Sequence, residues 1–302
     1  PYKELASELS RVGESWELSG MPGSESVVAE GPWTGSTLPE LIGRFGAELL
    51  GKANYARFGQ EFPLLVKFID AREDLSIQVH PDDELARKRH GKSGKCEMWY
   101  VLEAEPGASL LTGFSRPIAP AEYERRVADN TLTDVLNRQA IASGDVFYLP
   151  AGRVHSIGKG SFIVEIQQSS DITYRIYDFD RRDAAGNSRE LHTELAREAI
   201  DFESSENSRI TYAPENNQEV RLVTTPYFTT SLYTLTARTR CDWSATDSFV
   251  AIVLLQGSGS LTDNEGNRID VRQGETWLLP ASTQWTEITP HTATLRLLTS
   301  RI

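Results

Sequence analysis

The sequence predicts a mainly β protein made of two similar β halves, with helical insertions in the N-terminal half. Short segments rich in β-branched or aromatic residues recur along the chain and are bounded by Gly, Pro or Asp. Helical spacing is limited to a few segments. A motif of glycine, acid, apolar strand and proline occurs at 144–150 and again at 274–280. These three observations favour β-sheets as the framework and helices as additions to it.

Local patterns place the individual elements. The clearest strands are expected at 76–80, 98–102, 146–149, 162–166 and 249–255. The helical insertions are expected at about 37–50, 83–90, 118–140 and 189–203. The last strand is apolar on both faces, which is typical of a strand buried between two layers.

A stretch rich in Ser, Glu and Asn at 203–219 predicts a domain boundary near residue 215. The expected domains are 1–215, which carries the insertions, and 216–302. The repeated motif indicates that both share a fold, although glycine–strand–proline is also a common turn pattern. After its proline, the first copy places His155 where the second places Trp285. We therefore expect the functional site in the first domain and no metal site in the second.

The chain is acidic, with 43 Asp and Glu against 31 Lys and Arg and a formal charge of −12. Such a charge repels phosphate backbones and anionic membrane surfaces, so we expect no nucleic-acid or membrane partner. The apolar runs are far shorter than the roughly 20 residues that cross a bilayer. A phosphate ligand would need a local basic pocket.

Two further features predict a cytoplasmic location. Residues 1–10 are polar and lack the basic and apolar regions of a signal peptide. Cys96 and Cys241 lie far apart in the sequence and are interpreted as core thiols, which suits a reducing compartment.

Two histidines, a carboxylate and an amide are candidates for a metal site. Alternation along a strand places Gln78 and His80 on one face. Glu97 lies on the polar face of another strand, and a tight turn presents His155. These groups could close around one divalent ion, although each histidine alone could also be structural. That structural interpretation is kept for the remaining histidines, His90, His192 and His291.

The types of donor atom do not decide which metal would bind. Zinc binds His nitrogen and Glu oxygen, and a site with a single carboxylate keeps the ion strongly Lewis acidic. Two histidines and a carboxylate also form the facial triad of iron-dependent oxygenases.

Four segments stand out in order along the chain: QVHPD at 78–82, KCEMW at 95–99, PAGRVHSIG at 150–158 and IQQSSDITYRIYDFD at 166–180. They resemble the type I mannose-6-phosphate isomerases, in particular the short bacterial form. The similarity runs from residue 13 to about residue 200 and weakens through the C-terminal domain. It implies a cupin fold, a jelly-roll barrel or sandwich, for the first domain. With the repeated motif, we expect the second domain to be a cupin-like β domain without a metal.

The resemblance also implies roles for individual residues. The implied ligands of one zinc ion per chain are Gln78, His80, Glu97 and His155. The implied catalytic residues are Arg175 and Lys95, and the implied contacts of the sugar phosphate are Lys67 and Ser76. The three basic residues of this set would form the local positive pocket that an acidic protein needs for a phosphate.

The activity implied by the resemblance is the interconversion of mannose 6-phosphate and fructose 6-phosphate through an enediol. Zinc and Arg175 would stabilise the developing negative charge, and either Lys95 or a zinc-bound hydroxide would move the proton. One alternative is a metal-dependent cupin oxygenase, against which Gln78 and the basic residues argue. The other is a cupin that binds a sugar phosphate without turnover. The sequence predicts no oligomeric state.

Overall fold

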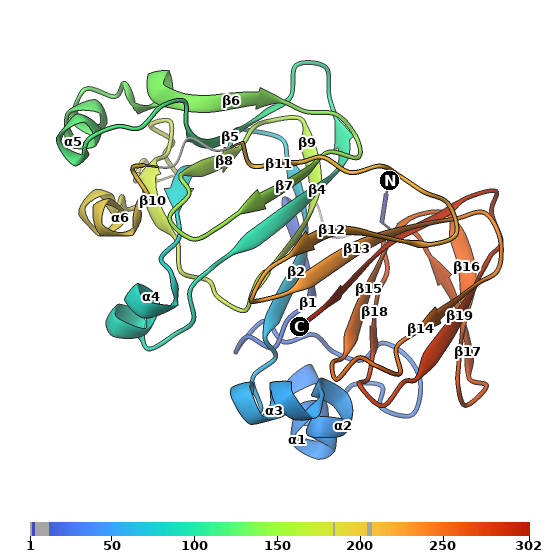
Figure 1. The fold of residues 1–302 in the computed structure, drawn as a ribbon. Helices are drawn as coiled ribbons and strands as arrows, with labels where there is room; N and C mark the ends of the chain where they lie inside the picture. The colour runs from blue at the N-terminus through green and yellow to red at the C-terminus, as the bar shows by residue number, and fades with distance from the viewer. Residues whose placement is uncertain (1, 4–11, 184, 204–206) are drawn as a thin grey trace. The chain divides into compact units, whose positions relative to one another are not determined.

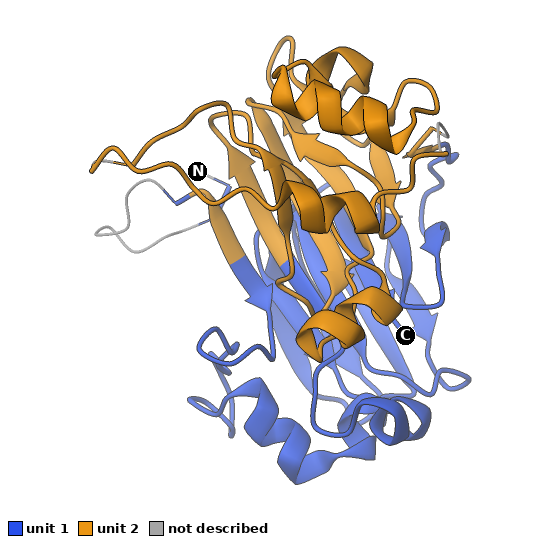
Figure 2. Ribbon diagram, turned by 90° about the vertical axis from the view of Figure 1, so that its left-hand side faces the viewer, with its two compact units in different colours: residues 1–12, 16–66, 211–302 blue, residues 13–15, 67–210 orange. Residues whose placement is uncertain are grey.

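The computed structural model describes residues 2–3, 12–183, 185–203 and 207–302. Figure 1 shows its strands and helices. Contacts between residues divide the chain into two compact units, which Figure 2 colours separately. Unit 1 comprises 1–12, 16–66 and 211–302, and unit 2 comprises 13–15 and 67–210. The expected domains, 1–215 and 216–302, are continuous in sequence, and that division stays a prediction.

Unit 2 is built on two sheets, the first of which also includes residues 16–18 and 64–66 of unit 1. The order in the first is β1 (Glu14–Leu18), β2 (Leu64–Ala71), β9 (Ser161–Gln168), β4 (Glu97–Ala104), β7 (Val146–Leu149) and β11 (Arg209–Ile210). The order in the second is β10 (Tyr174–Tyr177), β3 (Ile77–Val79), β8 (His155–Ile157), β5 (Ser109–Phe114) and β6 (Leu136–Ala140). Trp99 and Phe147 from the first sheet share an apolar cluster with Leu110 and Ile157 from the second. The sheets therefore form a β-sandwich with its core between them.

Helices cover the outer face of the second sheet of unit 2 (Figure 1). They are α4 (Asp83–His90), α5 (Pro120–Ala128) and α6 (Thr193–Ala199). Ile77 and Val79 of β3 share an apolar cluster with Ala86 of α4 and Ala196 of α6. Because side chains alternate along a strand, Gln78 between them faces the interior of the sandwich.

Unit 1 repeats this architecture. Its larger sheet has the order β12 (Glu219–Thr224), β13 (Thr229–Leu235), β20 (Leu295–Arg301), β15 (Val250–Gln256) and β18 (Thr276–Leu279). Its smaller sheet has the order β14 (Thr239–Asp242), β19 (Trp285–Pro290), β16 (Ser258–Asp263) and β17 (Arg268–Arg272). The core between them holds Ile252 and Leu297 from the larger sheet with Leu261 and Ile288 from the smaller.

The repeated motif occupies the same place in both units. Gly144 and Gly274 have φ angles of 90° and 85° and precede β7 and β18. The next strands, β8 and β19, begin at His155 and Trp285. The order β2-β9-β4-β7 returns as β13-β20-β15-β18, and β3-β8-β5-β6 returns as β14-β19-β16-β17. The predictions of a mainly β fold and of two halves with one fold are confirmed.

Most predicted elements are present. All five predicted strands appear, and β15 is buried along almost its whole length. The first insertion contains α1 (Leu38–Phe45) and α2 (Ala47–Leu50), and α3 (Lys52–Phe58) lies beyond it. Thr37 caps α1 in a capping box with Glu40, and Asp82 caps α4.

The prediction of helix throughout 118–140 is wrong in its second part. After α5 a 3₁₀ turn, η1 (Leu132–Val135), leads into β6. Asn130 has a φ of 54°, a left-handed conformation that an α-helix does not continue through. The residues that follow pair with β5, so pairing in the sheet replaces the expected helical bonds.

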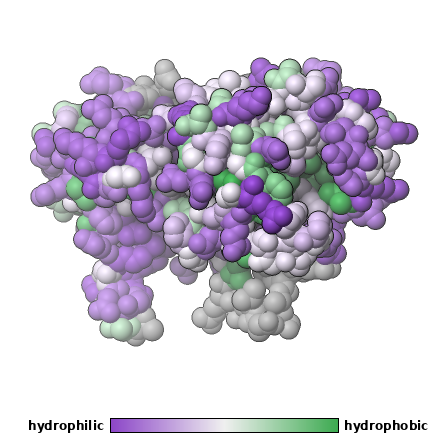
Figure 3. Space-filling view, turned by 90° about the horizontal axis from the view of Figure 1, so that it is seen from below, coloured by the Kyte–Doolittle hydropathy of each residue, from purple (hydrophilic) through white to green (hydrophobic). Residues whose placement is uncertain are grey.

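The face shown in Figure 3 is mainly hydrophilic and the two cysteines are buried, as the sequence predicts. Hydrophobic residues on this face occur in smaller groups. Within the part of the chain that the structure describes, no helix is long and apolar enough to span a membrane. Cys96 and Cys241 are buried free thiols, as expected.

Gly51, between α2 and α3, offers a test of packing in unit 1. Its φ is +94°, and a Cβ atom there would lie 2.2 Å from the backbone oxygen of Asp247. We expect Gly51→Ala to lower the free energy of unfolding by about 2–5 kcal/mol, because it adds backbone strain and a clash with main chain. Urea unfolding measures the change.

The matched control is Gly43→Ala in α1, where an added Cβ meets nothing within 4 Å. This variant should be stabilised by up to about 1 kcal/mol, because alanine favours a helix more than glycine does. Similar stability of the two variants would show that the close approach at Gly51 is not a constraint.

Candidate metal centre

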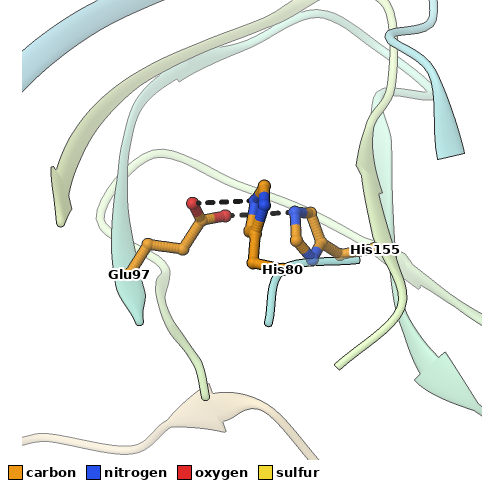
Figure 4. Close-up of side chains that lie close together, drawn as sticks. All are labelled: His80, Glu97 and His155. Atoms are coloured by element: carbon orange, nitrogen blue, oxygen red, sulfur yellow. Dashed lines mark ion pairs between the residues drawn. The ribbon is translucent and has the colours of Figure 1, made fainter. Parts of the chain in front are cut away.

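Three donors from both sheets of unit 2 converge inside the sandwich (Figure 4). Glu97 begins β4, His155 begins β8, and His80 directly follows β3. Nε2 of His80 lies 3.4 Å from Oε2 of Glu97, and Nε2 of His155 lies 3.2 Å from Oε1. The three side chains are at most 2% exposed. Each carboxylate oxygen therefore faces one imidazole in a site closed to bulk water.

Backbone carbonyls orient both imidazole rings. Nδ1 of His80 lies 2.8 Å from the carbonyl oxygen of Ile172, and Nδ1 of His155 lies 2.8 Å from that of Arg153. Since a carbonyl oxygen only accepts, each Nδ1 carries the hydrogen and each Nε2 keeps its lone pair. This arrangement is typical of histidines that bind a metal through Nε2.

The charge states also suit a cation. Burial, followed by the nearby Lys95 ammonium, lowers the pKa of His80 to about 3. Burial likewise lowers the pKa of His155. Burial opposes ionisation of Glu97, but its neighbours, chiefly the Lys95 ammonium, hold its pKa well below the usual range. The centre thus offers one carboxylate and two neutral imidazoles.

The buried carboxylate of Glu97 has acceptor sites that a bound cation could fill. Among the described residues neither of its buried oxygens has a donor in hydrogen-bond geometry. Lys95 forms an ion pair with it, with Nζ 2.9 Å from Oε2. A buried carboxylate normally fills its lone pairs, so open acceptor sites opposite two imidazole lone pairs fit a bound cation. His80, Glu97 and His155 could therefore hold a metal ion.

Gln78 lies beside this cluster. It pairs with His155 across β3 and β8, and its Nε2 atom is 3.3 Å from Nε2 of His155. Amide nitrogen and oxygen exchange places when the group is turned over, so Oε1 can occupy the same position. The structure thus brings all four residues of the expected ligand set together.

The two lysines of the expected set lie next to a second buried carboxylate. Nζ of Lys95 is 4.0 Å from Oε1 of Glu165, and Nζ of Lys67 is 3.4 Å from the same atom. Burial opposes the charge on Lys95, but Glu97 and Glu165 outweigh it and raise its pKa. Trp99 donates from Nε1 to Oε2 of Glu165 at 2.9 Å. Sequence reasoning missed Glu165, although an acid within the apolar run 162–166 was the available signal.

Ser76 and Arg175 are both neighbours of Gln78, the first along the sequence and the second across the sheet. Ser76 is 4% exposed and comes two residues before Gln78. Arg175 pairs with Gln78 across β10 and β3, so both side chains start from the same face of the sheet. Its Nη1 atom donates to the carbonyl oxygen of Glu190 at 3.0 Å. Its Nε atom is buried without an acceptor among the described residues.

The corresponding places in unit 1 carry different chemistry. The pair Asp242 and Trp285 corresponds to Gln78 and His155, and Val250 corresponds to Glu97. These residues supply one oxygen donor instead of a converging set.

Two β-sandwiches that share the same order of core strands, one with a His–Glu–His cluster in its interior, define a cupin-like fold with a candidate metal site. Residues 5–111 match the family model for the phosphomannose isomerase type I catalytic domain. The mannose-6-phosphate isomerase of Streptococcus mutans is 35% identical over 269 residues, covering 89% of this chain and 82% of that protein. ManA of Bacillus subtilis, a mannose-6-phosphate isomerase, is 34% identical over 274 residues, covering 89% and 84%.

The structure agrees with these sequence comparisons. The crystal structure of the mannose 6-phosphate isomerase from Bacillus subtilis superposes with a TM-score of 0.85 at 31% identity, over 96% of this chain and 90% of that one. The chain belongs to the type I mannose-6-phosphate isomerase family. Its membership in this family of enzymes confirms the resemblance stated from the sequence.

The geometry predicts how metal binding responds to substitution. His80→Ala, Glu97→Ala and His155→Ala should each lower bound metal by roughly 10-fold or more, because each removes a donor from a set with few members. Metal analysis of folded, gel-filtered protein gives the ratio per chain, and a thermal unfolding curve verifies folding.

The matched control is His291→Ala, which removes an exposed histidine of unit 1. It should keep the metal content of the unsubstituted protein. Normal metal content in all three site variants would refute the ligand assignment, and a second tightly bound equivalent lost with His291 would refute the expectation for unit 1.

Proposed function

We propose that this chain interconverts mannose 6-phosphate and fructose 6-phosphate, using one zinc ion held by Gln78, His80, Glu97 and His155. The observation that carries the proposal is the buried Glu97 carboxylate, whose oxygens face two imidazole Nε2 atoms. The names of the relatives support mannose 6-phosphate as the substrate and isomerisation as the class of reaction, and the nitrogen and oxygen donors suit zinc.

The bound metal would supply Lewis-acid stabilisation of the negative charge that develops on the sugar oxygens in an enediol. Lys95 lies beside the candidate metal centre, with its Nζ atom 2.9 Å from Oε2 of Glu97 and 3.2 Å from Nε2 of His80. Because Glu97 and Glu165 favour its charged form, Lys95 holds a proton at Nζ. It can donate a hydrogen bond in that state, and it can act as a base only after giving up this proton.

Arg175 would stabilise the same developing charge. Its side chain starts from the same sheet face as that of Gln78, and its buried Nε atom has a hydrogen available for a ligand. A fixed cation that meets an oxyanion stabilises the transition state more than the ground state. Both features support the role that we propose for Arg175 in the reaction.

Lys67 and Ser76 would bind the phosphate and so hold the sugar in place. Both are almost fully buried in unit 2. Lys67 also lies 3.8 Å from Glu14, whose side chain is half exposed. A phosphate would compete with this acid for the ammonium, and its binding energy would orient the reacting carbons. We place the enzyme in the cytoplasm, where its two free thiols would stay reduced.

The direct test is turnover before and after metal removal. Purified protein should convert mannose 6-phosphate to fructose 6-phosphate, lose this activity on chelation, and regain it with zinc. Turnover that is indifferent to chelation would contradict the metal-dependent reaction. Oxygen consumption in place of isomerisation would identify an oxygenase, and binding without conversion would identify a sensor.

Arg175→Ala tests the catalytic role of the arginine. We expect kcat to fall by roughly 10²–10³-fold, because one charge-stabilising donor is lost at the transition state. Metal content should stay unchanged. The matched control Arg182→Ala removes an exposed arginine of the same region and should leave kcat unaltered. A normal kcat with only a raised KM would make Arg175 a substrate contact instead.

A further inference from the structure

We propose that His192 is a positioning residue that holds Arg175 in its catalytic conformation; this rests on the role proposed above for Arg175. Two backbone contacts carry the inference. The N–H of His192 donates to the carbonyl oxygen of Arg175 at 2.7 Å. In the other direction, the N–H of Arg175 donates to Nδ1 of His192 at 3.2 Å. One residue thus binds both backbone groups of Arg175.

These contacts matter because Arg175 lies on an edge strand. Among the described residues, β10 is the outermost strand of its sheet and has β3 as its one neighbour. The pairing with β3 is irregular between Arg175 and Tyr177. An edge strand has unpaired backbone groups on its outer side, and an irregularity changes the direction of the side chains near it. At this position the sheet alone does not fix Arg175.

The chain segment that contains His192 also holds the other end of Arg175. The carbonyl oxygen of Glu190 accepts a hydrogen bond from Nη1 of Arg175 at 3.0 Å. Residues 190–192 therefore contact both the backbone and the guanidinium of the same residue. A side chain held at two points has fewer conformations to lose when a substrate binds.

This segment is itself anchored on both sides. Before it, Arg189 binds Asp178 through Nε at 2.8 Å and through Nη2, and Asp178 is 5% exposed. At its C-terminal end, His192 is the N-cap residue of α6, and its carbonyl oxygen accepts a hydrogen bond from the N–H of Ala196 at 2.8 Å. Ala196 is fully buried in the apolar cluster beneath α6. The segment can thus transmit the rigidity of the fold to Arg175.

The hydrogen bond from the N–H of Arg175 requires that Nδ1 of His192 be an acceptor. Nδ1 accepts from the backbone of Arg175, so it carries no hydrogen, and the side chain makes no capping bond to α6. An asparagine offers an oxygen near the same position and is also favoured at an N-cap, whereas leucine fills space without accepting. The sequence interpretation of His192 as structural missed this contact, because its partner is a backbone group.

The experiment compares His192→Leu and His192→Asn, each alone and combined with Arg175→Ala. We expect His192→Leu to lower kcat by roughly 10-fold or more, with KM for mannose 6-phosphate and metal content changed less than about threefold. His192→Asn should recover most of kcat. In the Arg175→Ala background, His192→Leu should cause little further loss, because it acts through the residue already removed.

Two measurements guard against a simple loss of folding. Hydrogen exchange of the peptide spanning β10 should quicken in His192→Leu and not in His192→Asn. The matched control His90→Leu removes the histidine whose Nε2 atom is 2.8 Å from the hydroxyl of Tyr174, in the same strand, and should leave kcat near normal.

Several outcomes would overturn the proposal. An unchanged kcat in His192→Leu, or an equal further loss in both backgrounds, would show that His192 does not act through Arg175. If Arg175→Ala kept full turnover, the catalytic role proposed for Arg175 would be wrong. His192 could then not act on turnover by positioning Arg175. Unchanged hydrogen exchange in β10 would refute the contact itself, whatever the activities.

Discussion

The buried carboxylate of Glu97 sets the constraints on the interior of unit 2. Its side chain is completely inaccessible, and a buried charge without partners is very costly. Lys95 neutralises it, while the imidazoles of His80 and His155 stay neutral and face it with lone pairs. Such a group is stable only if its partners are held in place. The sandwich provides this by placing the acid on one sheet and both histidines on or beside the other.

The two units separate what the fold requires from what the reaction requires. Unit 1 has the same strand order as unit 2, yet apolar Val250 and bulky Trp285 take the places of Glu97 and His155. The sandwich therefore forms without the metal donors. Its strands supply fixed positions that face one another, and the chemistry depends on the side chains at those positions. The same reasoning applies to Glu165, which shares Lys95 with Glu97 of the centre and adds a second buried negative charge.

Period-two alternation made much of the site predictable. It placed Gln78 and His80 on one strand face and Lys95 and Glu97 on another, and the repeated motif singled out His155. The role of Arg175 came from the family resemblance. Contacts to backbone were not predictable: Ile172 and Arg153 orient the histidines through carbonyl oxygens, which every residue type has. The strand β6 was missed because apolar spacing in 118–140 continues past the point where Asn130 turns the chain.

X-ray absorption at the edge of the bound metal reports the atoms around the ion and so tests whether Gln78, His80, Glu97 and His155 hold it. With these ligands we expect outer-shell scattering from two imidazole rings, with nitrogen and oxygen donors at about 2.0–2.2 Å. We also expect no sulfur, although the buried thiol of Cys96 is adjacent to Glu97 in the sequence. A sulfur neighbour at about 2.3 Å, or a spectrum without imidazole scattering, would contradict this ligand set.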